Sequence, residues 1–249
     1  MYEGGFQIDI DNLTLRSMPG EWAVIESPLT QFTDGHQNSV IRYSFDVEGG
    51  RLENLEITGG YYYGVMFWDW WDSNFDAGST HMGASGVTLD GIKIHDTGVD
   101  GIKITPAAND ITILNSEIYN TGRRTKSSAD GIDNNNGDRM IARGNYIHDV
   151  PGIGILTSGG TEGSLIEQNF VEDTGGAGIV NGFYTELEWI EPDANPGHFA
   201  SIDTIVRNNI VVDAGQAGIG IYGALNAQVY NNTLVNAADD AQAPIQFGG

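Results

Sequence analysis

Apolar residues occur along this chain in short runs that alternate with polar residues at a period of two, and Asn, Asp or Gly bounds each run. Such runs are typical of short β-strands joined by turns, because successive side chains of a strand point to opposite faces. Nowhere do apolar residues recur at the helical spacing of three and four over three turns. The pattern therefore predicts an all-β fold that is nearly free of helix.

Two sequence blocks recur in alternation. The first has Asn, an aliphatic residue and then Asp or Asn, as at 145–149 and 209–213. The second reads Gly-Ile-x-Ile at 101–104 and 218–221, and related copies begin at Gly64, Gly131, Gly152 and Gly178. The shortest interval between these glycines is 21 residues, and the longer intervals indicate insertions in loops. Repeats of this size predict a solenoid, in which every strand pairs in parallel with its counterpart one repeat later.

The repeats continue without a linker, so we predict one domain over residues 1–249, with about seven or eight coils. Loop insertions are expected at about 61–85, 121–130 and 181–200. The asparagines at the strand starts have a structural explanation, because Asn tolerates left-handed turns and stacked copies of it form ladders. These asparagines are Asn145, Asn169, Asn209 and Asn232.

Over residues 52–237, this alternation of Gly-Ile-x-Ile strands with Asn-x-Ile-x-Asp turns resembles the right-handed parallel β-helix of the pectate-lyase superfamily. That superfamily contains polysaccharide lyases, polygalacturonases, mannuronan epimerases, phage tailspikes and adhesins. The resemblance implies a single-stranded, right-handed parallel β-helix and a role connected with carbohydrate. It specifies the architecture more closely than the activity, because one fold hosts many functions.

The alternation also predicts which side chains leave the core. Lys103 points outward if Ile102 and Ile104 point inward. Asp100 and Asp130 precede the glycines of two successive coils and begin a neighbouring row. By the same phase, the outer row of Lys103 also contains Asp133, Gly154, Val180 and Gly220. We therefore expect the three acids and Lys103 within about 5–10 Å of one another, facing solvent beside a shelf of small residues and perturbing each other's ionisation.

Each of these residues also has a plain structural explanation. Asp is a common turn residue before Gly, which applies to Asp100 and Asp130. Lys103 and Asp133 would equally form a simple ion pair between neighbouring rungs. The spacing alone leaves both interpretations open.

The resemblance implies a specific chemistry for this cluster. Several lyases of the superfamily hold calcium with Asp side chains from successive coils, and a nearby Lys or Arg removes the proton beside the substrate carboxylate. The matching residues would be Asp100, Asp130 and Asp133 as calcium ligands and Lys103 as the base, with a pKa lowered by cationic surroundings. Arg124 would bind the substrate carboxylate as a charge clamp, and Asp133 would belong to the catalytic residues as well as to the calcium ligands. The implied activity is cleavage of an acidic, uronate-containing polysaccharide by β-elimination.

Two alternatives stay open. The stretch 128–133 resembles the Asn-Thr-Asp-Gly-Ile-Asp segment of polygalacturonases, although the Asp pair expected on the next coil is replaced by residues 151–154. Asp100 and Asp133 would then act as the paired acids of an inverting hydrolase, which needs about 6.5–9.5 Å between carboxyl groups. A non-catalytic carbohydrate-binding protein, adhesin or tailspike would instead explain the repeats and aromatic residues without any reaction.

Basic and aromatic residues suggest where a substrate binds. Six of the eleven Lys and Arg residues lie between 103 and 143, and we expect Arg123, Arg124 and Lys126 to overhang the shelf and bind carboxylates. Exposed aromatic rings are common platforms for sugar rings, although this aromatic segment would also form its own small apolar cluster. The further candidate substrate-binding residues are Tyr63, Trp68, Trp70, Trp71, His81 and Asn135.

Charge restricts the partners. A net charge of -23 opposes binding to nucleic acid and to anionic membranes, and no apolar run is long enough to span a bilayer. We expect a polysaccharide or oligosaccharide partner and, from the resemblance, an extracellular location, although the chain does not begin with a signal peptide. The open strand edges at the ends of a solenoid would be covered by a homo-oligomer if nothing else caps them.

Overall fold

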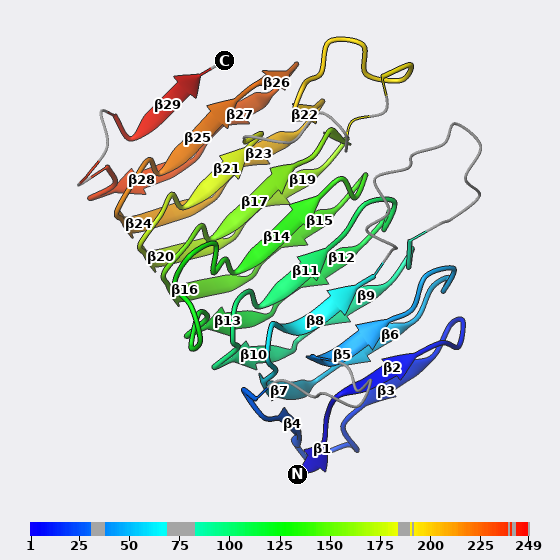
Figure 1. Cartoon of the computed structure of the whole chain (residues 1–249). Helices are drawn as coiled ribbons and strands as arrows, with labels where there is room; N and C mark the ends of the chain where they lie inside the picture. Colours follow the sequence, from blue (N-terminus) through cyan, green and yellow to red (C-terminus); the bar gives the residue numbers. More distant parts are fainter. Residues whose placement is uncertain are drawn as a thin grey trace.

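The computed structural model describes residues 1–30, 38–68, 83–183, 190, 192–238, 240 and 243–248. The chain winds into a rod of stacked coils, with the N-terminus at one end and the C-terminus at the other (Figure 1). Three long sheets run along the rod, and every strand pairing in them is parallel. The all-β solenoid predicted from the sequence is confirmed. No helix in the described ranges is long and apolar enough to cross a membrane.

Sheets I and II each have nine strands. Sheet I contains β1 (Tyr2–Glu3), β4 (Ala23–Ser27), β7 (Leu55–Gly59), β10 (Lys93–His95), β13 (Glu117–Tyr119), β16 (Tyr146–Val150), β20 (Phe170–Thr174), β24 (Ile210–Ala214) and β28 (Thr233–Val235). Sheet II contains β2 (Phe6–Ile8), β5 (Ser39–Tyr43), β8 (Tyr63–Phe67), β11 (Ile102–Ile104), β14 (Ile132–Asn135), β17 (Ile155–Ser158), β21 (Ile179–Asn181), β25 (Ile219–Tyr222) and β29 (Ile245–Gly248).

Sheet III has eight strands, and a small fourth sheet widens three of the later coils. Sheet III contains β3 (Thr14–Arg16), β6 (Arg51–Glu53), β9 (Thr88–Asp90), β12 (Thr112–Leu114), β15 (Ile141–Arg143), β19 (Leu165–Glu167), β23 (Ile205–Arg207) and β27 (Gln228–Tyr230). The fourth contains β18 (Thr161–Glu162), β22 (Ser201–Ile202) and β26 (Ala224–Leu225). Among the described residues, the rod thus has eight full coils and a partial ninth. The sequence predicted about seven or eight, because the coil of β4, β5 and β6 carries neither repeat block.

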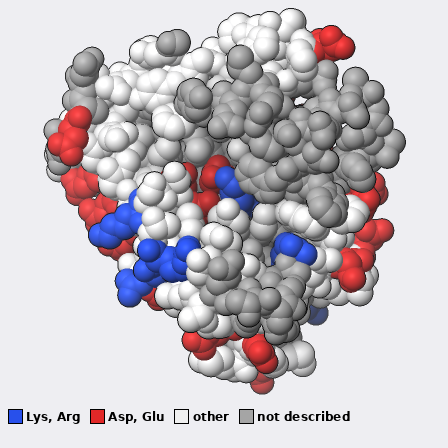
Figure 2. All heavy atoms as spheres, viewed as in Figure 1, with Lys and Arg blue, Asp and Glu red and all other residues white. Residues whose placement is uncertain are grey.

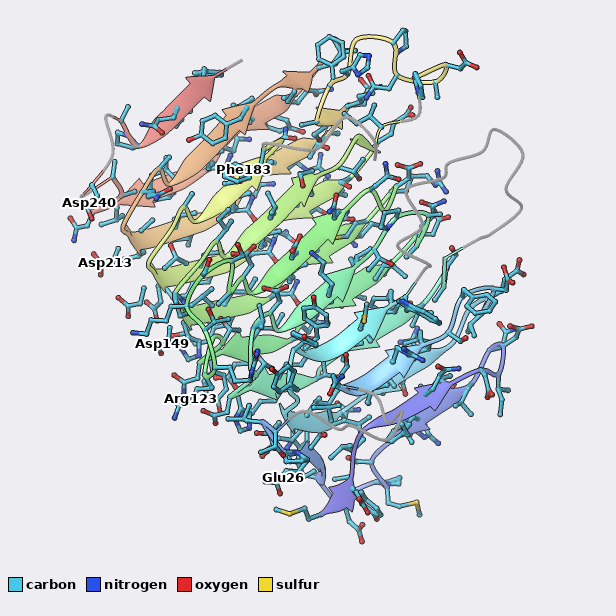
Figure 3. All side chains as sticks on the ribbon, in the orientation of Figure 1. Glu26, Arg123, Asp149, Phe183, Asp213 and Asp240 are labelled. Carbon is cyan, nitrogen blue, oxygen red and sulfur yellow. The ribbon has the colours of Figure 1, made fainter. Side chains whose placement is uncertain are left out.

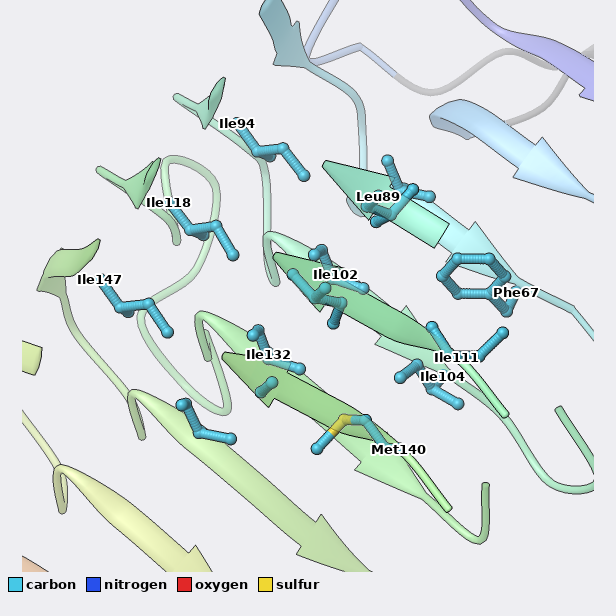
Figure 4. Packing of buried hydrophobic residues seen from close by; sticks show 14 of the residues in the cluster. Phe67, Leu89, Ile94, Ile102, Ile104, Ile111, Ile118, Ile132, Met140 and Ile147 are labelled. Atoms are coloured by element: carbon cyan, nitrogen blue, oxygen red, sulfur yellow. The ribbon is translucent and has the colours of Figure 1, made fainter. Parts of the chain in front are cut away.

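The core consists of columns of aliphatic side chains that run along the rod (Figure 4). In sheet I, one column stacks Ile57, Ile94, Ile118 and Ile147 in direct register. A second column in sheet II contains Ile102, Ile132, Ile155 and Ile179. Full burial of an aliphatic side chain stabilises the fold by roughly 1.5–3 kcal/mol, so the inward alternation of each strand provides the main driving force for stacking.

An asparagine ladder closes the turn before sheet I, as the sequence predicted. Asn169 Oδ1 accepts hydrogen bonds from the backbone N–H and from Nδ2 of Asn145, each at 3.0 Å, and Asn169 Nδ2 donates to Ala142 O at 2.9 Å. Asn209 repeats the pattern with Asn169 above it and with Asn232 on its other side. These amides are structural: they satisfy buried backbone groups from coil to coil.

The corner between sheets I and II carries a row of Asp and Asn residues in the left-handed conformation. Asn120, Asp149 and Asp173 have φ of 50°, 53° and 50°, and Asp96 and Asp213 occupy the same place on other coils. Asn and Asp enter this region more readily than other residues with a side chain. The turn geometry therefore explains why this corner is lined with short polar side chains.

The register differs from the sequence prediction on one coil. Gly131 N–H donates to Ile153 O, and Ile132 N–H donates to Gly154 O, so Gly131 aligns with Gly154 and not with Gly152. Asp133 therefore lies opposite Leu156, which replaces Gly154 in the outer row. The glycine column has a steric cause: a Cβ on Gly131 would lie 2.6 Å from Gly154 O. Pro151, which lacks an N–H, stays in the turn after β16.

The expected insertions are only partly described. Residues 61–68 belong to the coil, because Tyr63–Phe67 forms β8, and residues 69–82 lie outside the described ranges. The 121–130 segment folds back on the preceding coil, where Arg123 N–H donates to Thr97 O at 2.9 Å and Arg124 N–H donates to Gly98 O at 3.0 Å. This loop stands over the corner between sheets I and II.

Candidate functional site

Sheet II brings together the four charged residues that the sequence placed on one face. Lys103 in β11 lies directly opposite Asp133 in β14, and its Nζ forms an ion pair with Asp133 Oδ2. Asp100 and Asp130 enter the same two coils just before these strands. One carboxylate oxygen from each of Asp100, Asp130 and Asp133 lies within 4.8 Å of the others. We call these four residues the carboxylate cluster.

The cluster is buried, which corrects the expectation that it faces solvent. Lys103 and Asp133 are 7% and 8% exposed, and Asp100 and Asp130 are 2% and 3% exposed. Their side chains still leave the outer surface of sheet II, since Ile102 and Ile104 on either side of Lys103 belong to the core. Strand alternation correctly predicted that Lys103 and Asp133 point away from the core, but it could not predict that other segments bury them.

Two of the acids also tie successive coils together. Asp100 Oδ1 accepts the backbone N–H of Asp130 at 2.8 Å, and Asp130 Oδ1 accepts the backbone N–H of Ile153 at 2.7 Å. Both residues therefore have a structural role, although it is a bond to the next coil and not the turn role expected for Asp before Gly. These bonds occupy one oxygen of each carboxylate and fix the direction of the other.

Burial and mutual repulsion disturb the ionisation of the acids. Desolvation, followed by the charge of Asp133, raises the pKa of Asp100 well above its usual range. The same causes raise the pKa of Asp130 to about 7. Burial also raises the pKa of the Tyr63 phenol to about 12, although the nearby Lys103 ammonium opposes the shift.

Lys103 departs from the sequence expectation of an amine with a lowered pKa. Desolvation lowers its pKa, but the charges of Asp133 and Asp100 act in the opposite direction and prevail, so the pKa of Lys103 is raised. Its surroundings are anionic, whereas the lowered pKa required a cationic environment. Lys103 is consequently an ammonium as long as these two carboxylates are charged.

The cluster has the properties of a metal-binding group. When all three acids are ionised, three carboxylates against one ammonium leave two uncompensated negative charges in a buried place, which a divalent cation would balance. The raised pKa values of Asp100 and Asp130 mean that such a cation would displace protons from them. Two oxygens bound to one calcium ion at 2.3–2.6 Å are at most about 5 Å apart, which matches the observed grouping within 4.8 Å. The residues present therefore fit a divalent cation that prefers oxygen ligands.

The inverting hydrolase requires about 6.5–9.5 Å between its two carboxyl groups, to admit a water molecule. One oxygen of Asp100 and one of Asp133 lie within 4.8 Å of each other, and Asp133 is held by Lys103. This distance joins the nearest oxygens and not the two carboxyl groups, so the hydrolase stays an alternative.

A cleft of about 450 Å³ opens beside the cluster, and we call it the sheet II cleft. Asp130, Asp133, Asn135 and Lys126 line it on one side. The coils that follow supply Pro151, Gly152, Ile153, Leu156, Gly175 and Gly176. The predicted shelf of small residues is present, with Leu156 added by the shifted register. Figure 2 shows acidic and basic side chains meeting in a recess on this face, with further cations gathered beside it.

The three predicted substrate-binding cations take different places. Lys126 lines the sheet II cleft, and within the described ranges it forms no ion pair. Arg123 Nε lies 3.5 Å from Asp96 Oδ1. The Arg124 guanidinium lies 3.4 Å from the centre of the Tyr61 ring and donates to Tyr61 O at 3.2 Å. The structure places Arg124 against this tyrosine, and a catalytic role for it stays a prediction.

The aromatic candidates are only partly described. Tyr63 stands at the start of β8 within the electrostatic field of Lys103, Asp100 and Asp133. Trp68 follows β8 and packs edge-on against Phe45, at 5.7 Å between ring centres. Trp70, Trp71 and His81 lie outside the described residues, so their predicted contact with sugar stays a prediction.

Arg42, a further cationic residue on the outer face of sheet II, was not identified from the sequence. Arg42 in β5 belongs to the outer row of Lys103, because Arg42 lies opposite Met66 and Met66 lies opposite Lys103. Its guanidinium stacks on the Trp68 ring at 4.2 Å and its Nε donates to Gln7 Oε1 at 3.1 Å. The segment 39–43 lacks the leading glycine of the repeat. Its alternation of apolar and polar residues was the one signal available.

Comparisons with known proteins identify the fold. The family model described as right handed beta helix region matches residues 77–246. An alginate lyase from Paenibacillus sp. str. FPU-7 superposes with a TM-score of 0.64 at 18% identity, over 98% of this chain and 88% of that chain. The periplasmic alginate epimerase AlgG superposes with a TM-score of 0.55 at 16% identity, over 75% of this chain and 36% of the epimerase.

A surface adhesin of Streptococcus pneumoniae, PfbA, is a more distant match, with a TM-score of 0.47 at 12% identity over 84% of this chain and 61% of the adhesin. A comparison with curated proteins found no match. At these identities the structural likeness concerns the fold alone.

Proposed function

Since this chain belongs to the right-handed β-helix family, we propose that it is an enzyme that cleaves an acidic, uronate-containing polysaccharide by β-elimination. The observation that carries the proposal is the carboxylate cluster itself, which consists of three buried acids and one lysine. Two of the acids, Asp130 and Asp133, line a cleft together with small residues and with Lys126, which forms no ion pair in the described ranges. The alginate lyase and epimerase are, by their names, enzymes of a polyuronate, which is the substrate class proposed here.

Elimination removes the proton at C5 of the uronate, forms a double bond between C4 and C5, and expels the oxygen at C4. The electron pair of the broken C5–H bond becomes the new double bond, and the leaving oxygen takes up a proton. Positive charge near the substrate carboxylate stabilises the intermediate. We propose calcium as the cation of the cluster; when bound, it supplies this charge.

In this proposal, Lys103 Nζ and the Tyr63 hydroxyl exchange protons with the sugar, since both lie close to Asp133, which lines the sheet II cleft. Asp133 and Asp100 raise the pKa of Lys103, so Lys103 becomes a base only when those carboxylates are neutralised. The Tyr63 phenol, with a pKa raised to about 12 by burial, is protonated and can donate to a sugar oxygen. Lys126 and Asn135 would hold the substrate carboxylate and hydroxyl groups in the sheet II cleft.

The test is to incubate the protein with polyuronates, alginate and polygalacturonate among them, in the presence of calcium. The expected result is ultraviolet absorbance from the new double bond, lost in Lys103→Met. Lys93→Met is a matched control, since Lys93 pairs with Glu117 on sheet I, away from the cluster. Absence of absorbance on the whole panel, or equal loss in both variants, would refute the proposal.

The same experiment separates the alternatives. New reducing ends without absorbance indicate a hydrolase, and binding without any product indicates a carbohydrate-binding protein or adhesin. An extracellular location follows from this substrate class, and a homo-oligomer that covers the ends of the rod remains part of the proposal.

A further inference from the structure

A second cleft of about 510 Å³ lies on the other side of the 121–130 loop, over the corner between sheets I and II. We call it the corner cleft. Its wall comes from Asn120, Arg123, Lys126, Asp149, Asp173 and Leu29. Figure 3 shows Arg123 and Asp149 next to each other along this corner of the rod. None of the lining side chains belongs to the carboxylate cluster.

The corner cleft and the sheet II cleft adjoin each other. Lys126, Pro151 and Gly175 line both. Gly175 packs directly on Pro151 and has no side chain that could separate the clefts. A Cβ on Gly175 would lie 2.4 Å from Pro151 O. The two clefts are therefore contiguous at Lys126, Pro151 and Gly175.

The charges of the corner cleft are divided. Lys126 is exposed and forms no ion pair among the described residues, whereas Arg123 is shared with Asp96. Asp149 and Asp173 line the same cleft from the left-handed turns of their coils, and Asp149 Oδ2 lies 2.7 Å from His148 Nδ1. Cations and hydrogen-bond acceptors in one cleft suit a sugar that carries one carboxylate and several hydroxyl groups.

We propose that the corner cleft is a second sugar subsite, which binds the units of a uronate chain next to those in the sheet II cleft, with the carboxylate of the sugar between the two clefts at Lys126, which lines both. This inference rests on the proposed function of the carboxylate cluster. It implies that the polymer crosses the corner between sheets I and II instead of following the rod axis along sheet II. It also implies that affinity rises with chain length until both clefts are filled.

The test measures binding of size-defined uronate oligosaccharides, from disaccharide to hexasaccharide, by calorimetry with the full chain. Wild type should bind the longest oligomers at least about tenfold more tightly than the disaccharide, as one further charge-assisted hydrogen bond allows. Leu29→Trp should fill the corner cleft and remove this advantage while leaving the disaccharide unaffected, because Leu29 lines the corner cleft alone. Leu29→Ala, the matched control, should keep it.

Lys126→Met should weaken binding of the long uronate oligomers roughly tenfold and leave neutral glucan oligomers of equal length unchanged. Affinity that does not depend on length, or equal weakening of the disaccharide by Leu29→Trp, would overturn the subsite. Product assays keep the two proposals apart. A double bond formed without length dependence refutes only the subsite, and length-dependent binding without a double bond refutes only the lyase.

Discussion

Lys103 and Asp133 face each other across neighbouring strands of sheet II and form an ion pair whose side chains are 9% and 11% exposed. Such a pair balances the cost of removing both charges from water only while both partners are present. The same pair occupies the centre of the proposed site, so its removal affects stability as well as activity.

Lys103→Met should lower the free energy of unfolding by about 3–5 kcal/mol, because it leaves buried carboxylates without their cation. Lys103→Met combined with Asp133→Asn should recover part of this loss, since the double variant buries one charge fewer. Urea unfolding at constant pH measures both. Lys93→Met is the control: its ion pair with Glu117 is one-third exposed on both sides, so it should cost under about 1 kcal/mol. A Lys103 variant no less stable than the Lys93 variant would contradict the argument.

Asp130→Asn should have opposite effects with and without a divalent cation. In a chelator, it should raise the melting temperature above that of wild type, because it removes a buried negative charge while Asn Oδ1 still accepts the Ile153 N–H. With calcium at a hundredfold excess over its dissociation constant, wild type should gain about 2.7 kcal/mol, and the variant should gain little. Wild type whose melting temperature is the same with calcium and with chelator would exclude the metal site.

Asn169→Ala should destabilise the rod by roughly 3 kcal/mol, because it leaves two buried backbone groups of the preceding coil, the Asn145 N–H and the Ala142 carbonyl, without a partner. Asn232→Ala at the open end of the ladder removes the same type of residue from a partly exposed place, where water can replace it. Its loss should be clearly smaller in thermal unfolding. Equal losses of stability in the two variants would show that burial of the asparagine does not set the cost of removing it.

The comparison of sequence and structure shows what strand alternation can specify. It correctly placed Lys103 opposite Asp133, because the copies that begin at Gly101 and Gly131 align without ambiguity. It failed one coil later, since Gly152 and Gly154 are two residues apart and a shift of two keeps every side chain on its face. The hydrophobic pattern cannot distinguish such registers. The structure has the register in which Gly131 N–H donates to Ile153 O and Asp133 lies opposite Leu156.

Burial and ionisation were beyond the sequence for a different reason. The low exposure of Lys103 and the raised pKa values of Asp100 and Asp130 depend on packing between segments that are distant in the chain. The clefts depend on the path of the 121–130 loop, which folds back by backbone hydrogen bonds that no side-chain pattern records. The asparagine ladder, in contrast, repeats one residue type at one position and was predictable in full.

The row of left-handed residues at the corner between sheets I and II fixes the backbone turn without fixing the charge of the side chain. Positions such as 120, 149 and 173 require a residue that accepts positive φ, and both Asn and Asp do so. An exchange between the two alters the net charge of the corner cleft by one unit while the winding of the rod is unchanged. The charge that this cleft presents to a ligand can therefore be set by a single amide-to-acid replacement, without rebuilding the scaffold.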